Sequence, residues 1–443
     1  MSESIGGSGP GMKLHTKILI ALVVGAGTGI AANLTMGGDD PTVKWVNTYL
    51  AGPVGQVFLR MLFMIVMPLV FSSIALGVAG LGDLSKVGKV GGKAIGYFLG
   101  TTALAAIFGL IMVSTFRPGD SVPEDVRTEL MATFAEDAAG KIEAQATGGF
   151  GINTFVNIVT RNPVKSAADT DMLGIIFFGL IFGAALTQLK PERSEPMLKF
   201  LEALNDVVIV IVGMAMRLAP YGVAGLIFGV TSRFGFALLK PLGGYVLVVM
   251  GALLLHMFVN LSLILKFVIK INPIVYFSRI RAAMITAFST SSSSATLPAA
   301  LKAAQDGLGV PPKIAGFVLP LGSTMCMNGT SIFEGITVIF LCQVFGVDLS
   351  LGGMVIVIVM SVITAVGAAG VPGGSIPLLV GILAMMGVPG EAIAIVLGVD
   401  RILDMTRTVV NVSSDISATI FVAGSEGVWD ESMVSKEASG AAA

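Results

Sequence analysis

Residues 398 to 415, GVDRILDMTRTVVNVSSD, place ionisable side chains in a segment that is otherwise apolar. At 100° per residue, its polar side chains fall on one helical face, in a stripe roughly 100° wide. The stripe consists of Asp400, Asp404, Arg407, Thr408, Asn411 and Asp415. Because a charge at the bilayer centre costs at least roughly 2.5 kcal/mol, the stripe indicates a binding site for charged solutes. The alternative is a polar stripe that is buried only for helix packing.

The composition indicates the compartment. Of the 443 residues, 54% are hydrophobic and 12% charged, and the mean hydropathy is +0.89, far above that of soluble proteins. We therefore expect a multi-pass protein of the cell's inner (plasma) membrane, in contact with membrane lipid. The net charge of −1 argues against nucleic acid as a partner. Cys326 and Cys342 lie sixteen positions apart in one apolar segment, too far along a continuous helix for a disulfide.

Eight apolar spans are candidates for transmembrane helices, since several exceed the roughly 20 residues that cross a bilayer. They are residues 14–34, 52–81, 92–116, 171–189, 200–230, 242–270, 312–345 and 391–422. Basic residues gather at alternate connections, which the positive-inside rule assigns to the cytoplasm. The acidic stretch 118–145 is then expected to form an exposed loop outside the cell.

Two further apolar segments are irregular and predict re-entrant helical hairpins. Residues 273–306 are interrupted by the serine-rich run 289–294, and residues 351–387 by the glycine-rich run 367–375. Non-helical backbone at membrane depth needs protein or water to satisfy its hydrogen bonds, so both tips are expected at a site. Flanking charges favour entry of the first hairpin from the cytoplasm and of the second from outside.

The two hairpin units also resemble each other. The tips are followed by ATLP at 295–298 and GSIP at 374–377, and thirty residues after each proline comes a polar residue, Asn328 or Arg407. This pattern predicts inverted repeats. It places two hairpin tips and two interrupted helices around a midplane site, as in secondary transporters.

Several motifs together resemble the dicarboxylate/amino acid:cation symporters, the family of the glutamate and aspartate transporters. They are FLRMLFMIVMPLVFSSI (58–74), GYFLGTT (96–102), FVNIVTRNP (155–163), the serine tip with ATLP, MNGT (327–330), AGVPGGSIP (369–377) and the stripe 398–415. The resemblance implies an all-α integral membrane protein with eight transmembrane helices and two re-entrant helical hairpins. It also implies a homotrimer whose subunits each have a scaffold and an elevator-type transport domain.

The same resemblance divides the chain. The scaffold would comprise residues 13–81 and 150–231, and the transport domain residues 82–117 and 232–425. Residues 118–149 would form the extracellular acidic loop. The polar ends, 1–12 and 426–443, are expected to be disordered.

The resemblance also assigns roles to single residues. Arg407 would bind the side-chain carboxylate of the substrate, Asp404 its α-amino group and Asn411 its α-carboxylate, in keeping with guanidinium and carboxylate chemistry. The remaining contacts would come from the hydroxyls of Thr330 and Thr408 and from backbone groups of Ser291, Ser293, Val371 and Gly373. Taken alone, Arg407 could simply neutralise Asp404 one turn away.

These roles favour a small-molecule substrate, L-aspartate or L-glutamate. A C4-dicarboxylate lacks the ammonium that would match Asp404, and a neutral amino acid would leave Arg407 unpaired at a cost of roughly 3–5 kcal/mol. An ion channel is a less suitable alternative, because adjacent opposite charges match a zwitterion better than a bare ion. The sequence offers no convincing nucleophile and base, so we expect neither an enzyme nor an organic cofactor.

Sodium is the coupling ion that the resemblance implies, at sites that this sequence only partly keeps. The first site would use Asp415, Asn411 and the backbone of Gly322, but Cys326 replaces an asparagine carbonyl there, and a thiol suits a hard cation poorly. The second would use mainly backbone carbonyls around Thr324, Met327, Ala365, Val366 and Ala368.

The third cation site departs furthest from the family. It would use Thr101 and Thr102, but this chain has Asn328 in place of an aspartate and Phe98 in place of a tyrosine, and Cys326 lies nearby in sequence. Without a carboxylate nothing offsets the charge of a dehydrated cation, so we expect this site not to bind sodium. We predict one or two sodium ions per turnover, with proton coupling or loose coupling as the alternative.

Two further residues have open interpretations. His256, within the span 242–270, could titrate near neutral pH and serve a proton route, or it could form an interhelical hydrogen bond. Arg401, at the edge of the polar stripe, could gate the site in place of an arginine that some relatives carry on the first tip, where this chain has Ser291.

Overall fold

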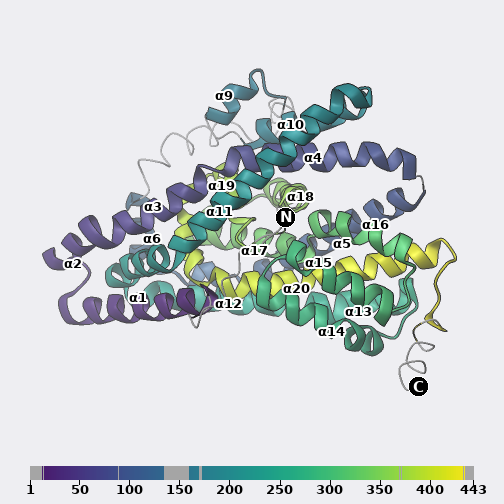
Figure 1. The fold of residues 1–443 in the computed structure, drawn as a ribbon. Coiled ribbons are helices and arrows are strands. Elements are labelled where there is room, and N and C mark those ends of the chain that lie inside the picture. The colour runs from purple at the N-terminus through teal and green to yellow at the C-terminus, as the bar shows by residue number, and fades with distance from the viewer. Residues whose placement is uncertain are drawn as a thin grey trace.

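In a computed structural model the chain folds into a bundle of helices (Figure 1). The structure describes residues 12, 14–87, 89–133, 159–168, 172–368, 370, 372–432 and 434. Throughout this part of the chain every regular element is helical, which confirms the all-α prediction. Most of the two predicted disordered ends, residues 134–149 of the predicted acidic loop and residues 150–158 of the predicted scaffold lie outside it.

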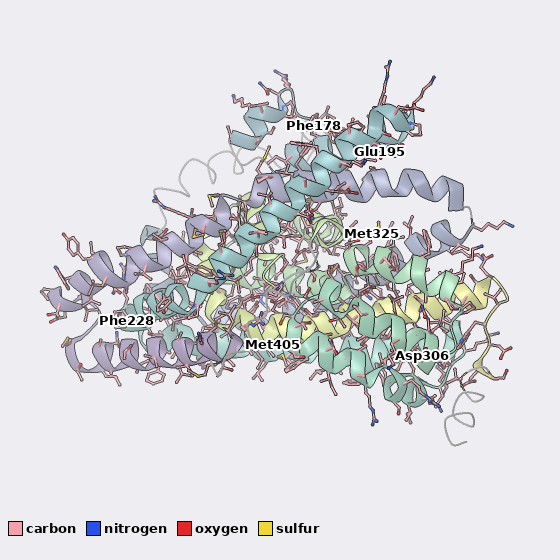
Figure 2. The ribbon with its side chains drawn as sticks, viewed as in Figure 1. Phe178, Glu195, Phe228, Asp306, Met325 and Met405 are labelled. Carbon is pink, nitrogen blue, oxygen red and sulfur yellow. The ribbon has the colours of Figure 1, made fainter. Side chains whose placement is uncertain are left out.

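The first group of packed helices is built on α11, which runs from Pro191 to Phe234. Its other members are α1 (Leu14–Met36), α2 (Pro41–Val46), η1 (Asn47–Ala51), α3 (Gly52–Phe63), α4 (Val66–Val87), α9 (Pro163–Ala168) and α10 (Met172–Thr187). Helices α1, α3 and α4 pack along α11, and α10 packs on α4. In Figure 2, Glu195 and Phe228 mark opposite ends of α11.

Glycines let the helices of this group approach closely. A Cβ on Gly25 of α1 would lie 2.6 Å from the carbonyl oxygen of Ala224 on α11, and one on Gly222 would meet the side chain of Phe58 on α3. Small residues at such crossings provide packing where lipid gives no hydrophobic drive. At these crossings the helix backbones thus approach closely, against a backbone at Gly25 and against an aromatic side chain at Gly222.

The second group of packed helices surrounds α20, which runs from Ala394 to Ser425. Before the serine tip come α5 (Lys89–Phe116), η2 (Pro118–Ser121), α6 (Glu124–Thr133), α12 (Phe236–Leu255), η3 (His256–Asn260), α13 (Leu261–Leu263), η4 (Ile264–Ile269) and α14 (Pro273–Thr290). After it come α15 (Ser293–Lys302), η5 (Ala303–Gly307), α16 (Pro312–Met325), α17 (Asn328–Val344), α18 (Leu351–Gly367), α19 (Ile376–Met385) and η6 (Gly390–Ile393). Helices α5, α12, α14, α16 and α17 all contact α20.

Several helical segments are long and apolar enough to cross a membrane. Among the described residues six qualify by length and hydropathy: Thr16–Met36, Pro41–Ala79, Lys89–Ser121, Pro191–Phe234, Phe236–Ile269 and Pro312–Val344. They coincide with six of the predicted spans. Helix α20 carries the charged stripe and is almost wholly buried within the bundle, where Met405 lies (Figure 2).

The irregular segments break where the sequence predicts. Helices α14 and α15 meet at Ser291, which is left-handed at φ 51°, and at Ser292, whose side chain caps α15. The second break separates α18 from α19 and includes Gly373 at φ 73°. We call these turns the first tip (Ser291–Ser294) and the second tip (residues 368–375, of which 369 and 371 are not described).

Only one of the two long helices at the site is interrupted. The backbone leaves the helical conformation at Cys326 and Met327, between α16 and α17. Helix α20 is continuous, so the prediction of a second interrupted helix is wrong. The charged side chains of α20 form ion pairs with one another. The helix therefore does not have to break and expose backbone carbonyl or N–H groups to neutralise these charges.

Parts of the tail predicted to be disordered and of the predicted exposed loop are packed against the fold. In the tail, Trp429 is 6% exposed and its indole donates a 2.7 Å hydrogen bond to the carbonyl of Leu308, and Val434 is also buried. In the acidic loop, α6 buries Val126 and Leu130. Both segments are polar on average, but their few apolar side chains pack against the hydrophobic core of the second group of helices.

Candidate functional site

The two tips, the start of α17 and the middle of α20 enclose a cavity. Its lining consists of Ser291, Ser293, Met327, Thr330, Ala368, Gly370, Ser375, Asp404, Arg407, Thr408 and Asn411. The fold therefore brings together all the predicted substrate residues except Gly373, which reaches Asp404 from beside the cavity, and Val371, which lies outside the described residues. The volume open to the centre of a water molecule is about 20 Å³, so a larger ligand requires side chains or tips to move.

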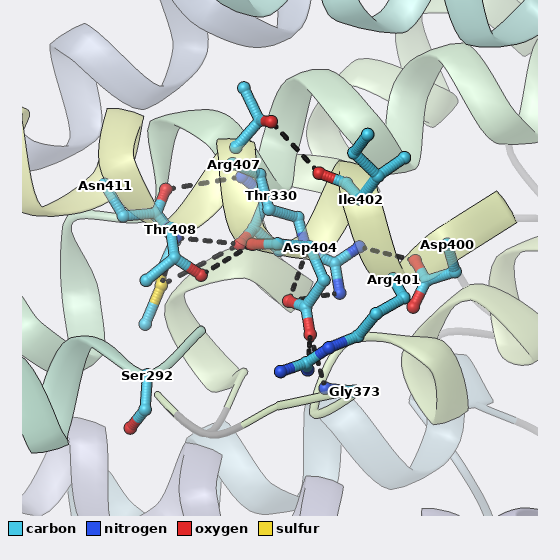
Figure 3. Close-up of polar contacts among 12 residues, drawn as sticks. Ser292, Thr330, Gly373, Asp400, Arg401, Ile402, Asp404, Arg407, Thr408 and Asn411 are labelled. Carbon is cyan, nitrogen blue, oxygen red and sulfur yellow. Dashed lines mark hydrogen bonds and ion pairs between the residues drawn. The ribbon is translucent and has the colours of Figure 1, made fainter. Parts of the chain in front are cut away.

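Four buried charges of α20 form one cluster beside this cavity (Figure 3). Arg407 donates to Asp404 Oδ1 at 2.9 and 3.0 Å and to Asp400 Oδ1 at 3.1 Å. Arg401 lies 3.4 Å from Asp404 Oδ2, which also accepts a 3.1 Å hydrogen bond from the backbone of Gly373. Two arginines and two aspartates make the cluster electrically neutral.

The local pairing of Arg407 with Asp404, one of the two sequence interpretations, is thus present in the structure. It does not compete with the other interpretation, because a zwitterionic ligand offers a carboxylate to the arginine and an ammonium to the aspartate. Each buried charge would then exchange one partner for another of the same sign. The ion pair keeps both charges neutralised at membrane depth.

The guanidinium of Arg407 is held from a second side by an aromatic ring. Its Cζ lies 4.2 Å from the centre of the Phe333 ring on α17, a cation–π contact. The Phe333 ring and the two aspartates restrict the rotation of the Arg407 guanidinium, so its N–H groups point in a fixed direction. The sequence analysis missed Phe333, because an aromatic residue in an apolar helix carries no special signal.

Asn411 joins α20 to the first turn of α17. Its Oδ1 accepts hydrogen bonds from the backbone of Gly329 at 2.7 Å and of Thr330 at 3.3 Å, and its Nδ2 donates to Thr330 Oγ1 at 3.1 Å. The amide therefore satisfies free N–H groups at a helix start. The hydroxyl of Thr408 donates to the carbonyl of Asp404 at 2.7 Å and keeps its lone pairs for the cavity.

A buried acid that the sequence analysis missed lies on α17. Glu334 is fully buried; Thr364 donates a 2.6 Å hydrogen bond to its Oε2, and no described residue donates to its Oε1. It also interacts electrostatically with Arg407. The sequence did contain a signal, since Glu334 is the only acid in the apolar segment 312–345. The cost of placing a charge at membrane depth, which drew attention to the stripe of residues 398–415, applies to Glu334 as well.

The residues predicted for the first cation site are only partly assembled. Asp415 Oδ1 would lie 2.9 Å from a Cβ on Gly322, and it accepts no hydrogen bond from the described residues. Cys326 lies beside the same carboxylate. The hydrogen bonds of Asn411 lead to α17 instead. At the predicted first cation site, the structure thus places the buried Asp415 carboxylate against the backbone of α16 at Gly322. The side chain of Asn411 does not join it there.

The residues predicted for the second cation site lie close to the cavity. Met327 and Ala368 line it. The carbonyl of Ala365 accepts a hydrogen bond from the backbone of Ala368 at 3.2 Å, and Val366 follows it in the last turn of α18. The hydroxyl of Thr324 donates to its own helix, to the carbonyl of Leu321 at 3.0 Å.

The residues of the third cation site form a neutral hydrogen-bond network. Asn328 Oδ1 accepts from the hydroxyls of Thr101 at 3.3 Å and Thr102 at 2.9 Å, while its Nδ2 lies 3.0 Å from Ser414 Oγ and 3.4 Å from His256 Nε2. Asn328 therefore has a partner at each polar atom, and His256 takes part in an interhelical hydrogen bond. The weak Cys326 thiol contact to Asn328, at 3.9 Å, belongs to the same network.

Together these features define a polytopic membrane protein with a buried, charge-balanced site between two helix tips. The family model of the sodium:dicarboxylate symporter family matches residues 14–425, and the chain belongs to this family, whose members are transporters and not enzymes. It is 35% identical to a proton/sodium-glutamate symport protein of Geobacillus stearothermophilus over 87% of this chain and 90% of the relative.

Two further relatives are named for different substrates. A proton/glutamate-aspartate symporter of Escherichia coli is 32% identical, over 94% of each chain. A C4-dicarboxylate transport protein of Bacillus subtilis is also 32% identical, over 95% of this chain and 96% of the relative. The chain is thus a multi-pass plasma-membrane member of a symporter family, and these relatives are named for glutamate, aspartate and C4-dicarboxylates.

Proposed function

We propose that the protein carries L-aspartate or L-glutamate into the cell together with sodium ions. The observation that carries this proposal is the neutral cluster of Arg407, Asp404 and their partners at a cavity closed by two tips. Arg407 would hold the side-chain carboxylate of the substrate, Asp404 its ammonium and Asn411 its α-carboxylate. The backbone of Ser291, Ser293, Val371 and Gly373 would close over it.

Charge balance supports cation coupling. With Glu334 protonated, the stripe of α20 together with Arg401 has three aspartates and two arginines, a net charge of −1, and an acidic amino acid adds another −1. Since uncompensated charge is costly at membrane depth, two sodium ions would restore neutrality. Asp415 would hold one near Gly322, and the carbonyls around Ala365, Val366 and Ala368 the other. The Asn328 network would hold none.

The proposed mechanism is an elevator motion. The first group of helices would be the scaffold, residues 13–81 and 150–231, and the second group the transport domain, residues 82–117 and 232–425. The packing supports this division, since α1, α3 and α4 pack on α11 and α10 packs on α4, while α5, α12, α14, α16 and α17 surround the charged helix α20, which α11 also contacts. Eight transmembrane helices, two re-entrant hairpins related by an inverted repeat and a homotrimer complete the proposal.

Binding to the purified protein in liposomes is the direct test. We expect saturable binding of labelled L-aspartate that tightens as sodium rises, and uptake that needs an inward sodium gradient. Excess unlabelled glutamate should compete, whereas succinate should compete at least about tenfold less well, since it leaves Asp404 without an ammonium. Stronger competition by succinate than by aspartate would instead assign the chain to dicarboxylate transport.

Proton coupling is the second candidate, because Glu334 is a buried carboxyl group with one oxygen unpaired among the described residues. A proton bound to Glu334 would neutralise this carboxylate, and coupling of this kind would need no sodium site. If protons drive transport, Glu334→Gln should make aspartate uptake insensitive to a pH gradient, with binding retained within about threefold. Asp348→Asn, at an exposed position after α17, is the matched control. Pure sodium coupling predicts that neither variant changes the pH response.

A further inference from the structure

The two tips are directly bonded to each other through one carbonyl group. The hydroxyl of Ser292 on the first tip donates a 2.6 Å hydrogen bond to the carbonyl of Gly370 on the second tip. The backbone N–H of Ser294 donates to the same oxygen at 3.3 Å. Both donors thus meet one acceptor from a segment more than seventy residues away, at the edge of the cavity.

The Ser292 hydroxyl is fixed in direction by its own helix. Its oxygen accepts a 3.1 Å hydrogen bond from the backbone N–H of Ala295 and so caps α15, while its proton goes to Gly370. Ser292 is 6% exposed, and the preceding residue, Ser291, holds the left-handed turn. The hydroxyl is therefore preorganised, and the bond to the second tip needs no reordering of the first.

Gly370 fits closely into its place. A Cβ there would lie 2.8 Å from both the Ser294 hydroxyl and the carbonyl oxygen of Ser323 on α16. The backbone of the second tip thus rests on α15 and α16 at once. Since Gly370 also lines the cavity, the second tip cannot move away from the site without breaking both hydrogen bonds.

We infer that Ser292 is a positioning residue that holds the second tip closed over the bound solute and so sets the rate at which the solute leaves. The inference rests on the proposed function for its ligand. The contact itself joins backbone and hydroxyl groups and makes no distinction between solutes. Its loss should change how long a substrate stays bound, and not which substrate is preferred.

The test compares variants of the full-length protein in liposomes. Ser292→Ala should release labelled L-aspartate about three- to tenfold faster, as expected for one net hydrogen bond, with the association rate and the aspartate-to-succinate preference unchanged. Ser292→Thr keeps the hydroxyl and should restore slow release. Ser289→Ala is the control, because that exposed hydroxyl bonds only to its own helix, at Ile285 and Thr286.

A second measurement does not depend on the ligand. Backbone hydrogen exchange of the peptide covering residues 366–378 should be faster in Ser292→Ala than in the unmodified protein, and unchanged in Ser289→Ala. Thermal unfolding of the variants shows whether the lost helix cap, and not the lost contact, is responsible.

If both exchange and release in Ser292→Ala match the unmodified protein, Ser292 does not hold the tip. Failure of any acidic amino acid to bind, with faster exchange, would instead reject the proposed substrate alone.

Discussion

Replacing Arg407 with alanine is expected to abolish recognition of acidic amino acids. The variant leaves Asp400 and Asp404 buried with Arg401 as the remaining arginine of the cluster, and it removes the guanidinium that lies over the Phe333 ring. Loss of one partner of a buried ion pair costs about 3–5 kcal/mol, and a loss of that size in binding would weaken Kd by roughly 10²- to 10⁴-fold. Arg407→Lys should recover little of this, because an ammonium cannot form the bidentate contact.

The measurement is equilibrium binding of labelled L-aspartate to purified, folded protein. Arg217→Ala is the matched control, since this arginine is exposed on α11, and it should bind as the unmodified protein does. The double variant Asp404→Ala with Arg407→Ala restores the charge balance and should recover thermal stability without recovering binding. Normal aspartate affinity in the single alanine variant would contradict the proposed role of Arg407.

Replacing Gly329 with alanine is expected to separate the two helices that carry the site. A Cβ at this position would lie 2.9 Å from the Cα of Arg407 and closer still to its carbonyl oxygen. These are backbone atoms of α20, which cannot rotate away as a side chain can. Overpacking costs about 1–3 kcal/mol even where side chains yield, so a larger loss of stability is expected here.

The same substitution also removes a hydrogen bond that positions the site. The backbone of Gly329 donates to Asn411 at 2.7 Å, and a shift of α17 would lengthen this bond. Gly335→Ala, two turns further along α17, is the matched control, since its new Cβ would meet its nearest neighbour at 3.7 Å, an ordinary contact. We expect a lower unfolding temperature and lost aspartate binding only for Gly329→Ala. Equal stability of the two variants would show that the helix crossing is not tight.

The features predicted correctly from the sequence are those that depend on neighbours along the chain. The apolar spans, the breaks at the serine-rich and glycine-rich runs and the one-sided stripe of α20 follow from composition and from helical periodicity. Even the convergence of the two tips with Arg407 and Asn411 was predictable, because a broken helix at membrane depth must meet another polar group.

Other features could not be predicted because they depend on surfaces brought together from distant parts of the chain. Helix α20 stays continuous because its charges find side-chain partners, which no local rule foretells. Trp429 is ordered because the Leu308 carbonyl lies within its reach, although the tail around it is polar. Glu334 is a different case: it could have been predicted as an isolated acid in an apolar span, but a single acid forms no stripe and was overlooked.

The amino-acid sequence alone established a membrane protein with a charged stripe on one helix and two apolar segments that break at serine-rich and glycine-rich runs, since burial cost and periodicity are local properties of a helix. The partner of each charge, the hydrogen bonds of the Asn328 side chain and the contact of Ser292 with Gly370 became known from the three-dimensional packing. The physical reason is that hydrogen bonds and ion pairs depend on distances of about 3 Å between groups far apart in the chain, which only packing sets.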